Sequence, residues 1–264
     1  MSTLPSVSTL PTSSVPTSSM PASSITVSRH EIFQTSLMSA LLDGVYEGEM
    51  TVRDLLGHGS FGIGTFNGLD GEMLIVDGRC YQLRADGGVT TADLGAYTPY
   101  AVVTNFVPHI ESRLPDNIVR SEASAFIDHM TASENYMYAL RIDGDFEWIR
   151  MRTVVKQEKP YRPMVAATDE DAIVELHNVS GSLVGFRTPL YEQGIGVPGC
   201  HTHFITDDRT GGGHVLDFKL KSGSAALCLG TDLRLQLPLT DAFREANLSP
   251  DDLAWQLAKT EQHA

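Results

Sequence analysis

The chain has 264 residues, 42% of them hydrophobic, and a formal net charge of −14 at pH 7. This length and composition are typical of a globular protein with a sizeable core, and they exclude a chain that is disordered throughout. The negative charge argues against binding to nucleic acid or to an anionic membrane surface.

Cysteine usage and the N-terminal sequence predict the compartment. The three cysteines, Cys80, Cys200 and Cys228, lack paired spacing and predict neither a disulfide framework nor a cysteine zinc site. The sequence has no run near the ~20 apolar residues of a transmembrane helix, and no export signal with basic and apolar regions. We therefore expect a cytoplasmic protein that has no membrane partner.

The N-terminal part of the chain combines a tail, two helices and a series of turns. Residues 1–28 repeat a Ser/Thr-Pro unit that buries too little apolar surface to fold, so we expect a disordered tail. From Glu31 to a stop at Gly44, apolar residues recur near helical spacing and predict a helix. A second short helix is expected at residues 50–56.

The next segment is predicted to be sheet. Asp-Gly pairs at 70–71, 77–78 and 86–87 separate short β-rich runs and predict hairpin turns. A helix is expected at residues 119–130, where apolar residues recur at helical spacing.

The second half of the chain is predicted to contain further hairpins. We expect one at 138–155 that turns at Asp143-Gly144, and one at 172–188 that turns at Ser180-Gly181. Because no βαβ alternation runs through the sequence, the predicted fold class is α+β.

The chain is predicted to end in helices and to divide into two parts. Two short helices are expected at 241–248 and 249–261, the second with Ser249 as its N-cap. We expect two abutting sheet-containing subdomains built from hairpins, an N-terminal one at 29–165 and a β-rich one at 166–264.

A hairpin in the C-terminal half carries three histidines. His201 and His203 are spaced i, i+2 on a predicted strand, so both imidazoles project from one face. His214 opens the return strand after a triple-glycine turn, and its face is apolar. Three imidazoles that leave a fourth position for water or substrate are typical of catalytic zinc, although iron, manganese or cobalt also suits them.

Four longer motifs in order resemble the acetolactate decarboxylases. They lie at residues 62–72, 152–162, 183–189 and 201–218, and the resemblance extends from about Ile32 to Glu261. It implies non-oxidative decarboxylation of 2-acetolactate to acetoin and carbon dioxide by a carboxy-lyase, on a two-domain α/β fold. It further implies a homodimer with a single zinc ion in each subunit.

The resemblance also implies the site residues. Glu261 is assigned by its position alone, because its flanking residues offer little motif. The implied zinc ligands are His201, His203 and His214, the implied catalytic residues are Glu72, Arg152 and Glu261, and Thr65 is a weaker candidate for substrate contact.

The expected chemistry agrees with these residue types. Loss of carbon dioxide from a small anionic 2-hydroxy-3-oxo acid moves an electron pair toward the ketone and gives an enediolate, which zinc would stabilise as a Lewis acid. Arg152 would pair with the substrate carboxylate or with the enediolate, and so supply local positive charge in an acidic protein. Glu72 and Glu261 would move the protons, in an order that the sequence leaves open.

Two other functions remain open from the residues alone. A cupin-like metal dioxygenase also uses two histidines spaced i, i+2 on a strand, although no glutamate follows here at the short cupin interval. A non-catalytic binding module stabilised by the metal is the second alternative.

Overall fold

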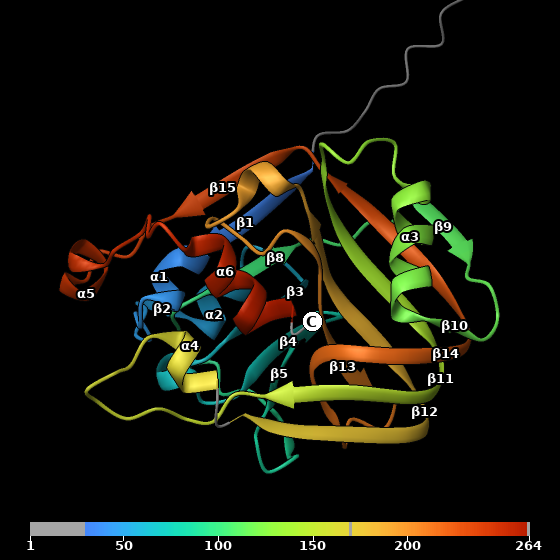
Figure 1. The fold of residues 1–264 in the computed structure, drawn as a ribbon, viewed down its shortest axis with the longest axis horizontal. Coiled ribbons are helices and arrows are strands. Elements are labelled where there is room, and N and C mark those ends of the chain that lie inside the picture. The colour runs from blue at the N-terminus through green and yellow to red at the C-terminus, as the bar shows by residue number, and fades with distance from the viewer. Residues whose placement is uncertain (1–29, 169–170, 263–264) are drawn as a thin grey trace, which may run out of the picture.

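The computed structural model describes residues 30–168 and 171–262 (Figure 1). The predicted tail at 1–28 lies outside these residues. Within them, two large sheets dominate and short helices surround them, so the predicted α+β class is confirmed. None of the helices in the described ranges is long and apolar enough to cross a membrane.

The first sheet has seven strands among the described residues, in the order β15-β1-β8-β3-β4-β5-β6. All neighbours are antiparallel except β1 and β15, which are parallel. Its strands are β1 (Glu31–Thr35), β3 (Phe61–Thr65), β4 (Glu72–Val76), β5 (Arg79–Leu83), β6 (Val89–Thr91), β8 (Ala101–Thr104) and β15 (Asp232–Gln236), and a separate small pair joins β2 (Met50–Thr51) to β7 (Tyr97–Thr98).

The three predicted Asp-Gly turns connect consecutive strands of this sheet. Residues 70–71 lie between β3 and β4, 77–78 between β4 and β5, and 86–87 between β5 and β6. Asp77 and Gly78 have φ angles of 51° and 75°, the left-handed conformation that a tight two-residue hairpin turn requires. The prediction of hairpins here is confirmed.

The second sheet has six strands in the described part of the chain, and four of them close into a ring. The main path is β10-β14-β11-β12-β13, β9 pairs with β14, and β13 also pairs with β14. Strands β11, β12, β13 and β14 therefore each pair with two others of the ring. The strands are β9 (Ile110–Arg113), β10 (Ile118–Val119), β11 (Met137–Thr153), β12 (Ala172–Thr188), β13 (Gly199–Thr206) and β14 (Gly212–Gly230).

Two predicted hairpins of the second sheet are wrong, because β11 and β12 run straight through the expected turns. Asp143-Gly144 and Ser180-Gly181 lie within strands of 17 residues each, and Gly144 pairs with both Gly181 and Gly223. A Cβ at Gly144 would lie 2.5 Å from the carbonyl oxygen of Ser222. These glycines therefore permit close approach of neighbouring strands. In the sequence alone, a glycine of this kind cannot be distinguished from a glycine in a hairpin turn.

The helices agree with the predictions in part. The predicted helix at 50–56 is α2, capped by Thr51, and the helix predicted at 119–130 is α3. The helix predicted from Glu31 is wrong in its first half, which forms β1, an inner strand whose residues are nearly all buried. The helices are α1 (Met38–Leu42), α2 (Val52–Leu56), η1 (Asn67–Leu69), α3 (Arg120–Met130), α4 (Met164–Ala167), η3 (Leu190–Glu192), α5 (Asp241–Glu245), α6 (Leu253–Leu257) and η4 (Ala258–Gln262).

The last predicted helix begins later than expected, whereas α5 begins at Asp241 as predicted. The N-cap of α6 is Asp252 and not Ser249, and η4 follows α6 directly. Figure 1 shows α6 and η4 running to the centre of the molecule, in front of the first sheet. The chain end is thereby brought to the junction of the two sheets.

The two sheets pack against each other through one shared core. Strand β12 contacts β3 and β4, and β13 contacts β4. Apolar side chains from both sheets form this core, among them Ile63 and Leu74 from the first and Val184 and Ile205 from the second. The chain passes from the first sheet to the second between β8 and β9. Residue 165, at which the first predicted subdomain ends, lies between β11 and β12, and both of these strands belong to the second sheet.

Candidate active site

The three predicted histidines lie together on two paired strands. His201 and His203 come from β13 and His214 from β14, and His203 is the direct cross-strand partner of His214. One nitrogen from each ring lies within 4.8 Å of the other two, and His201 Nε2 is 3.2 Å from His214 Nδ1. This cluster could hold a metal ion.

The orientation and charge of the imidazoles suit a cation ligand. His203 Nδ1 donates a hydrogen bond of 2.8 Å to the carbonyl oxygen of Met73, which leaves Nε2 unprotonated and facing the cluster. Burial lowers the pKa of His203 to about 4 and, together with neighbouring positive charge, holds the pKa values of His201 and His214 well below their usual range. All three rings are therefore neutral and carry a lone pair.

Two glutamates border the histidine cluster from different elements. Glu72, the first residue of β4, places Oε2 3.6 Å from His203 Nε2. Glu261, in η4, places Oε2 3.5 Å from His201 Nε2 and 3.8 Å from His214 Nδ1. Burial raises the pKa of Glu72 to about 8 and that of Glu261 to about 7, against the opposing effect of Arg152. Both carboxyl groups can therefore hold a proton near neutral pH.

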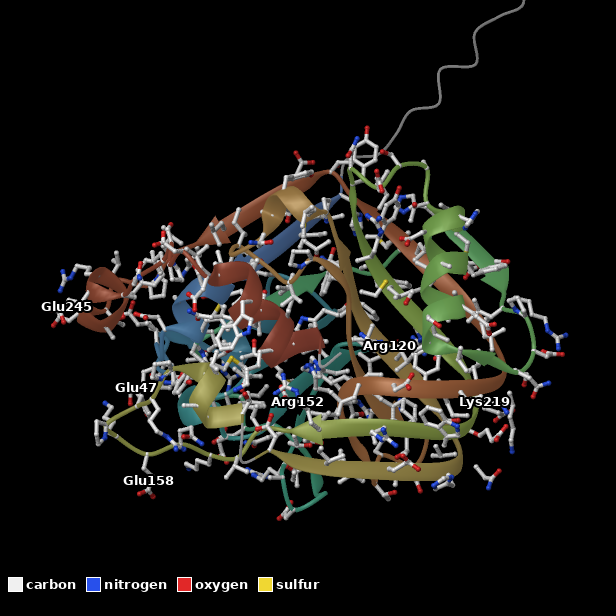
Figure 2. The ribbon with its side chains drawn as sticks, in the orientation of Figure 1. Glu47, Arg120, Arg152, Glu158, Lys219 and Glu245 are labelled. Carbon is white, nitrogen blue, oxygen red and sulfur yellow. The ribbon has the colours of Figure 1, made fainter. Side chains whose placement is uncertain are left out.

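Arg152 provides a buried positive charge beside the two glutamates. Its side chain is 1% exposed, and Nη2 lies 3.4 Å from Glu261 Oε1. Figure 2 places it near the centre of the molecule, whereas Glu158 and Glu245 lie at the periphery. The guanidinium is held in position at the end of β11, where Arg152 pairs with His214 on β14.

The sequence analysis missed Asp171, which forms an ion pair with Arg152. Nη1 of Arg152 donates a hydrogen bond to Asp171 Oδ2, and the aspartate side chain is only 5% exposed. Asp171 immediately precedes β12, whose first residues pair with the end of β11. The register of β11 against β12 is the feature that would have indicated Asp171. The sequence analysis did not predict this register because it placed turns inside both strands.

One buried cavity collects all the predicted site residues. Thr65, at the end of β3, pairs across the strands with Glu72, and its hydroxyl donates a hydrogen bond of 2.8 Å to the carbonyl oxygen of Gly71. Tyr100 was not predicted, yet it lies in the same wall and is 3% exposed. The cavity is lined by Met38, Leu41, Gly64, Thr65, Leu69, Glu72, Tyr100, Arg152, Val154, Met164, His201, His203, His214 and Glu261.

The charges around the cavity also fit a divalent cation. The buried carboxyl groups of Glu72, Glu261 and Asp171 face a single buried guanidinium, that of Arg152. The two glutamates can keep their protons near neutral pH, but a cation bound beside them would favour their ionised forms. With all three carboxyl groups ionised, two negative charges are left uncompensated at a place from which water is largely excluded. A doubly charged cation on the three imidazoles would balance them.

A buried set of imidazoles, carboxylates and one arginine with strongly shifted pKa values is typical of an enzyme active site. The family model described as alpha-acetolactate decarboxylase matches residues 32–250. An alpha-acetolactate decarboxylase from Klebsiella aerogenes is 49% identical over 222 residues, which cover 84% of this chain and 85% of the relative. One from Methanosarcina mazei is 44% identical and covers 88% of this chain and 80% of the relative.

A solved structure agrees with these sequence matches. The crystal structure of alpha-acetolactate decarboxylase from Bacillus subtilis strain 168 superposes with a TM-score of 0.86 at 42% identity, covering 88% of this chain and 99% of that chain. The chain belongs to the alpha-acetolactate decarboxylase family. The predicted carboxy-lyase is confirmed, and the dioxygenase and the non-catalytic binding module are disfavoured.

Proposed function

We propose that this enzyme converts 2-acetolactate to acetoin and carbon dioxide without oxidation, with a zinc ion bound by His201, His203 and His214. One observation carries the proposal. Three neutral imidazoles converge beside a buried arginine and two protonatable glutamates, in a chain of the alpha-acetolactate decarboxylase family. Each requirement of the reaction, an electron sink, a carboxylate partner and a proton donor, has a matching group in this cavity.

The donor set supports zinc without selecting it over every other metal. Imidazole nitrogen suits zinc, and the same three rings would also accept iron, manganese or cobalt. When bound, the ion supplies Lewis-acid stabilisation of the negative charge that develops on substrate oxygen atoms. The hydrogen bond from His203 to the Met73 carbonyl fixes one ligand ring before any ion binds.

Arg152 binds the substrate carboxylate in this proposal. Its Nη1 is already engaged with Asp171, whereas no group among the described residues accepts a hydrogen bond from its buried Nε. Nε is therefore available to a carboxylate, whereas Nη2 already donates to Glu261 Oε1 at 3.4 Å and would be shared between that glutamate and the substrate. Two parallel N–H donors match the geometry of the two carboxylate oxygens. Because Arg152 stays charged throughout, it holds the carboxylate until the carbon–carbon bond breaks.

Glu72 and Glu261 together handle the protons. When carbon dioxide leaves, the electron pair of the broken bond stays on the remaining carbon skeleton, which then gains one proton from the enzyme at carbon. The raised pKa values allow a carboxyl group to deliver that proton near neutral pH. The other carboxylate accepts and returns the substrate hydroxyl proton, and one proton enters from solvent in each cycle. Thr65 contributes to the cavity wall beside Glu72.

We also propose that the enzyme acts as a cytoplasmic homodimer. The family resemblance supports the dimer, and the three cysteines, all free, fit a reducing compartment. Apolar side chains on and after β15, including Leu235 and Leu239, are exposed and would suit a subunit contact.

The decisive experiment is an acetoin assay with control of the metal. We expect purified protein to release acetoin and carbon dioxide from 2-acetolactate, to lose this activity after chelation, and to regain it with zinc. Elemental analysis should give one metal ion per chain. The absence of acetoin from metal-loaded protein would refute the proposed reaction, and turnover that survives complete removal of metal would refute the metal's role.

A further inference from the structure

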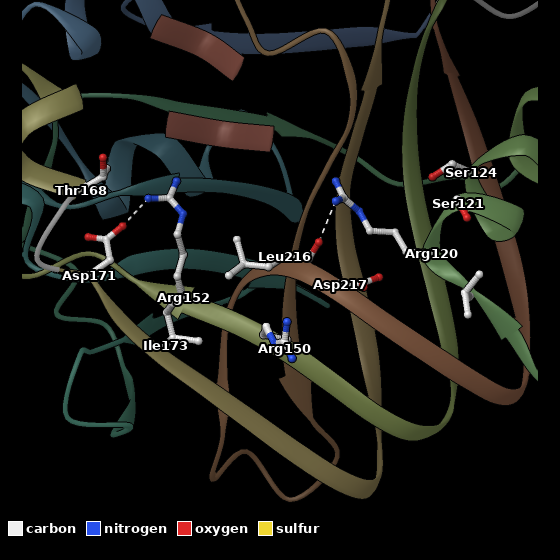
Figure 3. Close-up of a pocket in the computed structure, with 11 residues that line it drawn as sticks. Arg120, Ser121, Ser124, Arg150, Arg152, Thr168, Asp171, Ile173, Leu216 and Asp217 are labelled. Atoms are coloured by element: carbon white, nitrogen blue, oxygen red, sulfur yellow. Dashed lines mark hydrogen bonds and ion pairs between the residues drawn. The ribbon is translucent and has the colours of Figure 1, made fainter. Parts of the chain in front are cut away.

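Figure 3 shows a second, open pocket that lies next to the active-site cavity, with which it shares one lining residue. Its volume is about 800 Å³, and its wall is formed by the start of α3, the end of β11, the start of β12 and the first third of β14. Arg152 lines both this pocket and the active-site cavity. A small molecule in the outer pocket is therefore one side chain away from the histidine cluster.

The outer pocket contains a cation that the proposed mechanism does not use. Arg120, the first residue of α3, donates a hydrogen bond of 2.7 Å from Nη1 to the carbonyl oxygen of Leu216. In Figure 3 the guanidinium groups of Arg120 and Arg152 lie on either side of Leu216 and point to the same side.

The other charges of the pocket are largely compensated, whereas that of Arg120 is not. Arg150 forms an ion pair of 2.9 Å with Glu175, and Asp171 is engaged with Arg152. Asp217 is the cross-strand neighbour of Arg150, but it forms no ion pair with it among the described residues. In the part of the chain that the structure describes, no carboxylate forms an ion pair with Arg120. Its positive charge is therefore available to a mobile anion.

Two further features favour an anion at this place. The pocket lies at the N-terminus of α3, a helix of 11 residues, where Ser121 and Ser124 line the wall and the helix dipole is positive. Arg152, which lines the pocket, has a buried Nε with no acceptor among the described residues. In a protein of net charge −14, such a positive opening is the place where an anionic substrate meets the least repulsion.

We propose that this pocket is the vestibule through which small carboxylate anions reach the active site, and that Arg120 attracts the carboxylate before Arg152 binds it. The inference rests on the proposed function, because it takes the substrate to be an anion. Arg120 acts on capture and not on the bond-breaking step. Its removal should therefore lower kcat/KM through KM and leave kcat unchanged.

The test compares Arg120→Gln with Arg113→Gln, which removes the same charge elsewhere. Arg113 is 74% exposed on β9, pairs only with Asp116 among the described residues and does not line the vestibule. At low ionic strength we expect Arg120→Gln to lower kcat/KM for acetolactate about tenfold, and Arg113→Gln to match the wild type. Raising the ionic strength to about 0.5 M should remove most of the difference, because salt screens the attraction.

A lysine variant separates charge from structure. Arg120→Lys keeps the charge but alters the hydrogen bond to Leu216, so it should recover most of kcat/KM and the salt dependence. The inference is overturned if Arg120→Gln has the same kcat/KM as Arg113→Gln. It is also overturned if the loss of kcat/KM in Arg120→Gln does not change with salt, is not recovered in Arg120→Lys and accompanies a lowered unfolding temperature. Wild-type protein that makes no acetoin refutes the proposed function instead, so the two failures are distinguishable.

Discussion

The two sheets contribute different chemistry to the same cavity. Every nitrogen group of the site comes from the six-stranded sheet, since β11 carries Arg152 and the adjoining β13 and β14 carry the histidines. The glutamates come from elsewhere, Glu72 from the seven-stranded sheet and Glu261 from η4. The groups that would bind metal and carboxylate are therefore fixed within one hydrogen-bonded sheet, whereas the groups that would move protons reach the site through packing between elements.

This difference teaches that binding and proton transfer should be separable by mutation. Loss of a group on the six-stranded sheet should abolish metal or carboxylate binding. Loss of a glutamate should slow turnover and leave the metal in place. The predictions below test that division, beginning with the largest expected effect.

His203→Ala should abolish both metal binding and activity. His203 is 2% exposed, and its ring is fixed by the Met73 carbonyl, so no other side chain can take its place. We expect acetoin formation to fall by roughly 10³-fold or more, with metal content well below one ion per chain. The exposed His177 offers the control His177→Ala, which should keep both. A His203→Ala variant with full metal content would show that the six-stranded sheet does not supply the metal ligands as proposed.

Glu72→Gln should slow turnover without loss of metal. The amide keeps the shape of the side chain but cannot accept or release the proton, and we expect kcat to fall about 100-fold. Metal content, measured by elemental analysis, should match that of the wild type. If the metal is lost as in His203→Ala, Glu72 acts as a ligand and the proposed separation of roles between the sheets is wrong.

Asp171→Asn should have the smallest effect of the three. Asp171 orients Arg152 but does not itself line the cavity that contains the histidines, so the expected change is about a tenfold rise in KM with a smaller fall in kcat. Asp171→Glu should restore part of the loss, because it restores the charge. An Asp171→Asn variant whose KM is unchanged would show that the end of β11 alone positions the guanidinium.

The histidine cluster was predictable from sequence because its members are close in the chain. Two strands joined by a short turn bring His201 and His214 together with no knowledge of the rest of the fold. Glu72 and Arg152 have no such local pattern, and only the resemblance to a family indicated them. Asp171 was not predicted as a site residue, because its contact with Arg152 depends on the register of β11 against β12.

The same dipeptide accounts for a success and a failure. Asp77-Gly78 turns the chain between β4 and β5, whereas Asp143-Gly144 lies in the middle of β11. The difference is in the surroundings, since nothing lies within 4 Å of a Cβ built on Gly78 but a backbone oxygen lies 2.5 Å from one on Gly144. Local sequence carries no information about such tertiary approach, and for the same reason the buried inner strand β1 was predicted as helix.

The ring formed by β11, β12, β13 and β14 has a consequence for the lifetime of the site. Residue His203 is paired on both sides, to Val184 on β12 and to His214 on β14, so the segment that carries it cannot peel away by breaking one row of hydrogen bonds. Fraying that begins at a free sheet edge stops before it reaches these residues. The ligand set should therefore persist through the local opening events that release a loosely held ion, and exchange of the metal should be slow compared with turnover.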